Sequence, residues 1–465
     1  MYQTDFSDTI IALSTPPGLG AIGVIRLSGN KAVDVVNTIF VGKDLLKQPS
    51  HTLHFGKLVH QNTILDEVVV SLFLAPTSYT KENVVEISCH GSPYIIQRVI
   101  ETLIENGARA AKPGEFTMRA FLNGRFDLSQ AEAVADLIAA DSEASHRSAI
   151  TQMKGGFSVE IKKLREKLIH FASLIELELD FGEEDVEFAD RIDLQRNIDE
   201  LKQAIFHMKE SFRVGNVIKN GIPVVLAGRP NAGKSTLLNA LVNEERAIVS
   251  DIAGTTRDTI EVPINISGTI FRLIDTAGIR DASDTIEAIG VKKTYEQIKN
   301  AAILLYIFDA NDLSELQVLE DINKLNNNNL TILLVANKCD LCHEHALGML
   351  EFSINELTKN AYPIFEISAD KKQNLQELKD YLESVTGINP YLNDNSLVTN
   401  IRHFEALTNC YLSLEKVNEA LRVKITGDFL AQDIRYALSA LSEITGDITT
   451  EDLLDNIFSK FCIGK

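Results

Sequence analysis

Residues 223–236 read PVVLAGRPNAGKST, and this stretch decides the fold of the central part of the chain. Its first five residues form an apolar run typical of a buried strand, and residues 228–235 fit the P-loop pattern GxxxxGK[ST]. Residues 236–242 continue as a helix-like segment. Glycines let the backbone curl so that its N–H groups point at phosphate oxygens, and the helix adds the positive end of its dipole. Strand, loop and helix together predict a nucleotide-binding α/β module.

The loop and the first turn of the helix carry the residues expected to contact the nucleotide. Lys234 is suited to neutralise the β- and γ-phosphates, which makes it a candidate catalytic residue. The hydroxyl of Ser235 is suited to ligate Mg²⁺. The contacts expected from this segment are Asn231, Ala232, Gly233, Lys234, Ser235 and Thr236.

Further motifs at strand ends indicate the metal and the base. Residues 275–278 (DTAG) follow a strand-like run, as expected of a carboxylate near Mg²⁺ and a glycine N–H that senses the γ-phosphate. Residues 337–340 (NKCD) close another apolar run, and their aspartate can accept the N1–H and the exocyclic amine of guanine, donors that adenine lacks in this arrangement. Residues 368–369 (SA) follow a short strand and can offer a backbone N–H to guanine O6. The order of the motifs predicts a GTP site with contacts from Asp275, Gly278, Asn337, Lys338, Asp340, Ser368 and Ala369.

The pattern lacks the usual side chain for orienting water. Ras-like GTPases carry a glutamine directly after the Asp-x-x-Gly motif, but Ile279 stands at this position and cannot orient a water molecule. The acidic candidates downstream are Asp281, Asp284 and Glu287. A cation is also needed to neutralise the negative charge that develops between the β- and γ-phosphates, and no arginine is an obvious candidate for this role.

A monovalent cation is one solution to this gap. The side-chain oxygen of Asn231 can ligate an ion beside the phosphates, and residues 250–258 (SDIAGTTRD) form a candidate switch segment. Thr256 in this segment suits Mg²⁺, and the backbone carbonyls suit K⁺. A simple capped loop is the alternative interpretation of the same stretch.

Length and composition indicate the number of domains, the class of partner and the cellular compartment. The chain has 465 residues, which predicts about three domains, and its net charge of −20 argues against a protein that binds polyanions by bulk charge. The five cysteines are scattered, which fits a reducing compartment. The polar start of the chain lacks the layout of a signal peptide, and no apolar run is long enough to span a membrane. We therefore expect a cytoplasmic protein.

The distribution of strand-like runs, turns and helical periodicity along the sequence predicts a multidomain protein of α/β and α structure. Residues 1–120 mix strand-like runs with turns, residues 121–219 are helical, residues 220–387 form the nucleotide module with a mainly parallel sheet, and residues 388–465 are helical again. The economical interpretation is a Ras-like G domain inserted into one discontinuous helical domain. Two separate helical domains are the alternative. Thr449 and Asp452 predict the N-terminal cap of a last helix.

Several of these motifs together resemble one protein family. They are the GRPNAGKS stretch at 228–235, DIAGTTRD at 251–258, DTAGIR at 275–280 and the terminal FCIGK at 461–465. With TPPG at 15–18 and PGEF at 113–116, they resemble the MnmE (TrmE) family of tRNA-modifying GTPases across essentially the whole chain. The resemblance implies a homodimer that works with an FAD-binding partner, MnmG, on tRNA. The implied reaction adds an aminomethyl or carboxymethylaminomethyl group to C5 of the wobble uridine, with 5,10-methylene- or 5-formyl-tetrahydrofolate as the carbon donor.

The resemblance also implies roles for individual residues. The N-terminal domain would be a folate-binding α+β domain, the G domains would dimerise with K⁺, Glu287 would orient water, and Cys462 would be a candidate reactive thiol. Ser250, Thr255 and Thr256 would join the GTP contacts. The implied metal and folate ligands are Ser235 and Thr256 for Mg²⁺, Asn231, Ser250, Ile252 and Thr255 for K⁺, and Arg26, Glu86, Arg125 and Lys465 for folate.

Other interpretations compete with this one. A regulatory GTP switch, such as a ribosome-assembly GTPase, would carry the same G domain. Cys339, Cys342, His343 and His345 resemble part of a zinc site, but Cys339 belongs to the guanine motif and a second ligand pair farther along is missing.

Overall fold

A computed structural model of the chain describes residues 8–180, 191–245, 261–275, 298, 301–311, 315–325, 330–341, 362–385, 394–423 and 427–465. The chain divides into two compact units. Unit 1 comprises Met1–Ala135, Gln152–Leu201 and Asn409–Lys465, and unit 2 comprises Asp136–Thr151 and Lys202–Thr408. The two units are described separately.

Unit 1 contains a seven-stranded sheet in the order β3-β4-β5-β6-β2-β1-β7. Its neighbouring strands are antiparallel except for the parallel pair β1 and β7. The strands are β1 (Thr9–Leu13), β2 (Ile22–Ser28), β3 (Phe40–Val41), β4 (Thr52–His60), β5 (Thr63–Phe73), β6 (Val84–His90) and β7 (Ala108–Ala110).

Buried and more exposed side chains alternate along the strands and so distinguish the two faces of this sheet. Ile25, Leu27, Val85 and Ile87 are buried and pack with apolar residues of the helices α1 (Ala32–Asn37) and α2 (Pro93–Glu105). Successive side chains of a strand point to opposite faces, so the intervening charged residues face away from this core. The sheet therefore presents Arg26 of β2 and Glu86 of β6 on its other face, directly opposite each other in the register.

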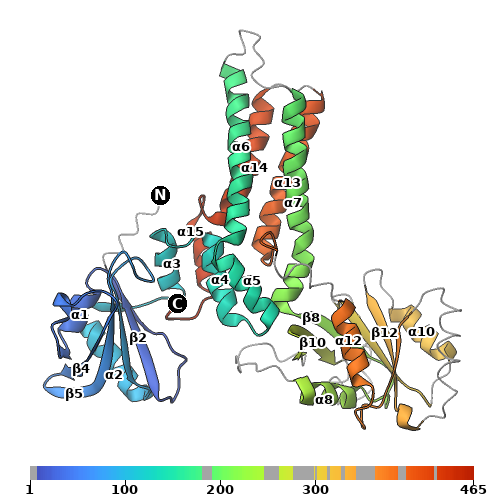
Figure 1. Ribbon diagram of the computed structural model, residues 1–465, viewed down its shortest axis with the longest axis horizontal. Coiled ribbons are helices and arrows are strands. Elements are labelled where there is room, and N and C mark those ends of the chain that lie inside the picture. The colour runs from blue at the N-terminus through green and yellow to red at the C-terminus, as the bar shows by residue number, and fades with distance from the viewer. Residues whose placement is uncertain are drawn as a thin grey trace, which may run out of the picture. The chain divides into compact units, whose positions relative to one another are not determined.

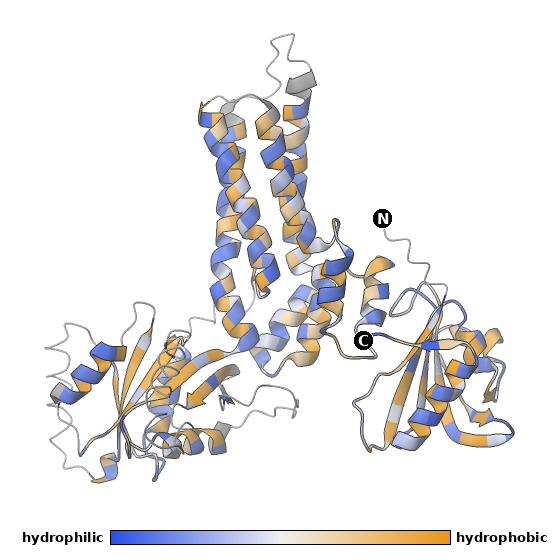
Figure 2. Ribbon diagram, turned by 180° about the vertical axis from the view of Figure 1, so that it is seen from behind, coloured by the Kyte–Doolittle hydropathy of each residue, from blue (hydrophilic) through white to orange (hydrophobic). Residues whose placement is uncertain are grey.

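Helices make up the rest of the described part of unit 1 and connect to unit 2. Polar and apolar residues are interspersed along the long helices (Figure 2), as expected of helices that bury only one face. Helix α6 packs against α14, and Asn418 of α13 bonds to Gln195 and Asp199 of α7. Unit 1 contains α3 (Glu115–Leu122), α6 (Gly156–Asp180), α14 (Gly427–Thr445) and α15 (Glu451–Phe458) and parts of α4 (Leu128–Ala139), α7 (Arg191–Asn220) and α13 (Ile401–Val423), whereas α5 (Glu143–Met153) falls almost wholly in unit 2.

Unit 2 contains a six-stranded sheet in the order β13-β12-β11-β8-β10-β9, parallel except for the antiparallel edge strand β9. The carboxyl ends of the parallel strands therefore meet at one edge of the sheet. Figure 1 labels β8, β10 and β12 of this sheet and its helices α8, α10 and α12. The elements are β8 (Ile222–Ala227), α8 (Lys234–Glu245), β9 (Glu261–Ile266), β10 (Thr269–Asp275), β11 (Ile303–Asp309), α10 (Glu315–Leu325), β12 (Thr331–Asn337), β13 (Ile364–Ile367) and α12 (Leu375–Val385).

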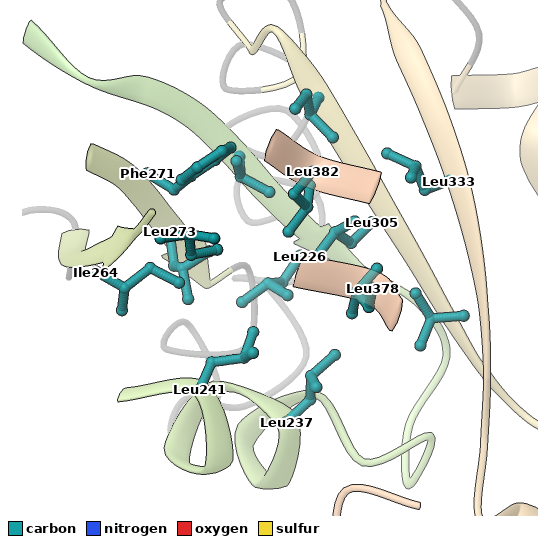
Figure 3. Packing of buried hydrophobic residues seen from close by; sticks show 14 of the residues in the cluster. Leu226, Leu237, Leu241, Ile264, Phe271, Leu273, Leu305, Leu333, Leu378 and Leu382 are labelled. Atoms are coloured by element: carbon teal, nitrogen blue, oxygen red, sulfur yellow. The ribbon is translucent and has the colours of Figure 1, made fainter. Parts of the chain in front are cut away.

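Both faces of the unit 2 sheet are covered, which explains its continuous apolar strands. On one face, Leu226, Leu305 and Leu333 of three parallel strands meet leucines of α8 and α12 (Figure 3). On the opposite face, the intervening residues pack against Val318 and Ile322 of α10. The sheet and its helices form the P-loop GTPase arrangement predicted from the sequence.

The predicted fold class is confirmed, with one local correction. The last helix is capped by Thr450, not by Thr449 with Asp452, because the Thr450 side chain accepts from the Leu453 N–H. The sequence offers two adjacent threonines, and only the backbone geometry distinguishes them. The domain boundaries at 120, 219 and 387 remain predictions. Among the described residues, none of the helices has the length and apolarity needed to cross a membrane.

Candidate functional site

The P-loop begins where β8 ends at Ala227. Gly233 has a left-handed φ of +91°, and a Cβ there would lie 2.1 Å from Asn337 Nδ2. A side chain at this position is therefore excluded twice, by the backbone angle and by the neighbouring amide. The glycine brings the loop into direct contact with the Asn337–Asp340 segment that follows β12.

Lys234 is buried inside the loop that it closes. Its ammonium donates to the carbonyl oxygens of Gly228 at 2.7 Å and Arg229 at 2.9 Å. Ser235 and Thr236 are exposed in the first turn of α8, where backbone N–H groups lack helical partners and attract anions. Lys234, Ser235 and Thr236 thus lie as a phosphate site requires.

The side chain of Arg229 is engaged elsewhere. Its Nε donates to Asp321 Oδ2 of α10 at 2.8 Å, and the Tyr306 hydroxyl of β11 donates to the same oxygen at 2.6 Å. Burial alone would raise the pKa of Asp321, but the hydrogen bonds from Arg229 and Tyr306 lower it below its ordinary value. The carboxylate therefore fixes this arginine to α10, which argues against Arg229 as the cation for the β- and γ-phosphates.

Asn337 joins the P-loop to the segment that follows β13. It is almost fully buried, its Nδ2 donates to the Ala232 carbonyl at 2.9 Å, and its Oδ1 accepts from the Ala369 N–H at 3.0 Å. Ser368 and Ala369 are buried beside it. The register places Asn337 opposite Ile367. The structure thus brings the predicted phosphate and base motifs together through one asparagine.

Asp340 is exposed within the short helix η3 (Cys339–Leu341), three residues after Asn337. Lys338 before it pairs with Asp309 at the end of β11, with 2.6 Å between Nζ and Oδ2. The backbone of Asp275 ends β10 beside Leu226 of β8. These positions put the predicted motifs at the carboxyl edge of one sheet, where ligands of open α/β sheets bind.

Some predicted residues lie outside the described part of the chain. They are Ser250, Ile252, Thr255, Thr256, Gly278, Asp281, Asp284 and Glu287, together with Cys342, His343 and His345 of the alternative zinc site. The side chain of Asp275 lies outside it as well. The described residues contain no group of three or more histidine, cysteine, aspartate or glutamate side chains suited to a metal ion.

A second cluster lies on the sheet of unit 1. Arg26 forms a two-bond ion pair with Glu86, at 2.8 Å from Nε and 2.7 Å from Nη2 to the same carboxylate oxygen. The Arg26 guanidinium lies 5.2 Å from the ring centre of Tyr79 and 5.8 Å from that of Phe116. A planar cation held between rings and a carboxylate is kept in one orientation.

Arg125 approaches the same tyrosine. Its guanidinium lies 5.1 Å from the Tyr79 ring centre and 5.0 Å from that of Phe126, and it donates to the Ser78 carbonyl. Arg26 and Arg125 therefore share one aromatic ring. The structure brings together these two predicted residues, which are separated by most of the N-terminal domain in sequence.

The C-terminus of the chain completes this cluster. Arg26 and Ser14 both donate to the Gly464 carbonyl at 3.4 Å. A Cβ at Gly464, whose φ is +96°, would lie 2.3 Å from the Leu13 carbonyl oxygen, so only glycine allows the chain to pass there. Burial, followed by repulsion from Arg26, lowers the pKa of Lys465. Cys462 is exposed two residues before Gly464.

Sequence reasoning missed the partners of the predicted residues. Tyr79, Phe126, Asp309 and Asp321 carry no sequence signal of a role in either site, and Phe116 enters only as the last residue of the PGEF motif. A lone aromatic or aspartate carries no motif, and only its proximity to Arg26, Lys338 or Arg229 gives it significance.

Comparison with known proteins decides the family. The "MnmE helical domain" model matches residues 128–462, and the "GTP-binding protein TrmE N-terminus" model matches residues 9–125. The tRNA modification GTPase MnmE of Cytophaga hutchinsonii is 54% identical over 462 residues, covering 99% of both chains. That of Bacteroides fragilis strain YCH46 is 50% identical over 463 residues, covering 98% of this chain and 99% of the relative. The chain belongs to the MnmE family of tRNA modification GTPases.

Membership of the MnmE family decides between the two functional classes left open by the sequence. The protein is a GTP hydrolase of tRNA modification, and a G domain serving only as a regulatory switch is not needed to explain it. The candidate GTP site lies in unit 2 and the arginine cluster in unit 1.

Proposed function

We propose that this MnmE-family GTPase couples K⁺-activated GTP hydrolysis to a folate-dependent modification of tRNA. It acts with an FAD-dependent partner to add an aminomethyl or carboxymethylaminomethyl group to C5 of the wobble uridine of certain tRNAs. The protein works in the cytoplasm as a homodimer. The observation that carries this proposal is the convergence of Arg26 and Arg125 on Tyr79, with Glu86 paired to Arg26 and the Gly464 carbonyl, next to Lys465, accepting from Arg26.

In the proposed GTP site, the P-loop N–H groups and Lys234 hold the β- and γ-phosphates. Oxygen ligands suit Mg²⁺, and the hydroxyl of Ser235 at the start of α8 fits this ion. Thr256 and the Asp275–Gly278 segment complete the metal and γ-phosphate contacts. Asp340 receives the guanine N1–H and amine. The backbone N–H groups of Ser368 and Ala369, expected to meet O6, donate in this structure to the Gln373 carbonyl and to Asn337 Oδ1.

K⁺ at this site would supply positive charge beside the β- and γ-phosphates in addition to that of Lys234. Asn231 lies in the P-loop with a left-handed φ of +63°, and its side chain is exposed. Its amide oxygen fits a monovalent ion, and Ser250, Ile252 and Thr255 are the other proposed ligands. Glu287 orients the attacking water, since Ile279 cannot. The ion-paired state of Arg229 supports this assignment.

The arginine cluster fits a reduced folate by its chemistry. A pterin has an amide-like donor edge that a carboxylate such as Glu86 can receive, and its flat ring suits a surface of aromatic side chains. The glutamate tail of a folate carries carboxylates that Arg125 and Lys465 can pair. Folate supplies the one-carbon unit when bound. The residues of this chain bind and orient it beside the exposed thiol of Cys462.

Folate binding tests the cluster directly. Titration calorimetry of the full chain with 5-formyltetrahydrofolate is expected to show binding that Glu86→Gln weakens at least tenfold. Glu67→Gln is the matched control, because Glu67 also pairs with a cation across neighbouring strands, Lys57 at 3.3 Å. Equal affinity of both variants and the unchanged protein would remove the assigned folate site.

The modification and the hydrolysis need separate measurements. Mass spectrometry of wobble uridines from a deletion strain is expected to show loss of the C5 group, restored by the intact gene and not by the Glu86→Gln form. Phosphate release is expected to be several-fold faster in KCl than in NaCl, and Glu287→Ala is expected to slow it while nucleotide binding persists. Unchanged uridines would exclude the tRNA reaction, and equal rates in the two salts would exclude K⁺ activation.

A further inference from the structure

The backbone of Lys338 is held in an unfavourable conformation. Its φ is +66°, in the left-handed region that residues with side chains rarely adopt. Such a conformation persists only when its surroundings hold it in place. Because Lys338 lies between Asn337 and Asp340 in one turn, whatever fixes this residue also sets the direction of the Asp340 carboxylate.

The side chain of Lys338 is fixed by Asp309. Asp309 ends β11 and lies opposite Asn337 in the parallel register with β12. Its Oδ2 lies 2.6 Å from Lys338 Nζ, and its Oδ1 accepts from the backbone N–H of Asn311 at 3.0 Å and from Asn311 Nδ2 at 3.2 Å. Burial would raise the pKa of Asp309, but these donors lower it, so the carboxylate stays ionised at neutral pH.

The backbone around Lys338 is tied to the same segment. The Ala310 N–H donates to the Asn337 carbonyl at 3.0 Å, and Asn311 Nδ2 donates to the Lys338 carbonyl at 3.4 Å. The Leu341 N–H also donates to the Lys338 carbonyl, at 3.0 Å. Residues 309–311 therefore hold both the side chain and the backbone of the left-handed residue.

We infer that Asp309 is a positioning residue for guanine selection, acting through Lys338 on the turn that presents Asp340. Asp309 does not touch the base in this scheme. This inference rests on the proposed role of Asp340 as the guanine acceptor. It predicts that loss of the Asp309 charge weakens recognition of the base more than binding of the phosphates.

The test compares nucleotides that differ only in the exocyclic amine. Fluorescence titration with N-methylanthraniloyl-GDP, followed by competition with GDP and IDP, gives both affinities for the full chain. In Asp309→Asn we expect GDP to bind about tenfold more weakly, equivalent to about 1.4 kcal/mol, and IDP less than threefold more weakly. Asp309→Glu keeps the charge and is expected to recover most of the GDP affinity.

Two further variants make the result specific. Glu261→Gln is the matched control, because Glu261 pairs with Arg272 at 3.2 Å on the edge strand β9 of the same sheet, three strands away from β11, and it is expected to change neither affinity. If Asp309→Asn does not fold, Asn311→Ala replaces it, with an expected threefold loss for GDP and a smaller one for IDP. Circular dichroism checks folding in each case.

The outcomes separate this inference from the proposed GTP site. Asp340→Asn is expected to abolish the preference for GDP over IDP, and an unchanged preference there would overturn the assignment of Asp340 itself. If Asp340→Asn behaves as expected while Asp309→Asn keeps the GDP-to-IDP ratio, the positioning role of Asp309 is overturned. Equal losses for both nucleotides in Asp309→Asn would overturn it as well.

Discussion

Replacement of Asn337 by alanine is expected to loosen the whole nucleotide edge of unit 2. The side chain makes two buried hydrogen bonds, one to the Ala232 carbonyl of the P-loop and one from the Ala369 N–H beyond β13. Alanine cannot make either bond. The carbonyl and the N–H are then left without this partner, in a place where the asparagine itself is 2% exposed.

The magnitude follows from the cost of unsatisfied buried groups. Each orphaned backbone group costs about 1–3 kcal/mol, so the substitution should lower the free energy of unfolding by about 2–6 kcal/mol. This is a large part of the roughly 5–15 kcal/mol by which a domain is stable. For a domain of this size, a loss near the middle of the range corresponds to a fall in Tm of roughly 8–16 °C.

Scanning calorimetry of the full chain measures this effect. The chain contains no tryptophan, so intrinsic tryptophan fluorescence is not available as a probe. The transition of the nucleotide-binding unit is identified as the one that saturating GDP raises, because a ligand stabilises the state that binds it. Asn337→Ala is expected to lower this transition and to leave the others in place.

Asn239→Ala is the matched control, since Asn239 is an exposed asparagine on α8, a helix that packs on the same sheet. It is expected to change stability by no more than about 0.5 kcal/mol. A fall of less than about 1 kcal/mol in the free energy of unfolding of Asn337→Ala would refute the reasoning, because the loss of two buried hydrogen bonds should cost more than this. So would an equal effect of the two substitutions.

Three further predictions concern other contacts. Against the opposing effect of burial, hydrogen bonds from Arg229 and Tyr306 hold the pKa of Asp321 below its ordinary value, so this pair stabilises the fold at neutral pH and its contribution is lost as pH falls through the folded pKa. Asp321→Asn should therefore lower urea resistance at pH 7, by an amount that shrinks as the pH is lowered below about 4, and a deficit that does not change with pH would contradict this. Gly233→Ala should abolish binding of N-methylanthraniloyl-GDP through its clash with the Asn337 amide, and retained micromolar affinity would contradict the geometry. Gly464→Ala should weaken the binding of 5-formyltetrahydrofolate at least tenfold in calorimetry, because a side chain there displaces the terminus from Leu13. Unaltered binding would show that the terminus is not part of the folate site.

The sequence predicted best where the signal is local. The P-loop glycines, the apolar run before them and the helix after them are read within about 20 residues, and β8 and α8 confirm them. The strand that ends at Asn337 is marked by a continuous apolar run, and Ser368 directly follows the short strand β13. The cap of the last helix failed by one residue because Thr449 and Thr450 offer the same chemistry.

The sequence failed where function depends on partners from distant segments. Arg26 and the Gly464 carbonyl lie 438 positions apart in sequence, and their contact is set by the path of the C-terminus beside β1. Asp309 meets Lys338 because β11 and β12 are parallel neighbours. Hydrophobic periodicity shows that a strand exists, but it carries no information on which strand lies beside it.

Residues 228–235 and the motifs after them established by themselves a GTP-binding module and the types of side chain at its edge. The tertiary structure decided which charges stand opposite one another: Asp309 against Lys338, Asp321 against Arg229, and Glu86 against Arg26. The physical reason is that backbone conformation responds to neighbours a few residues away. An ion pair instead depends on distance in space, which strand order and packing fix only when the chain has folded.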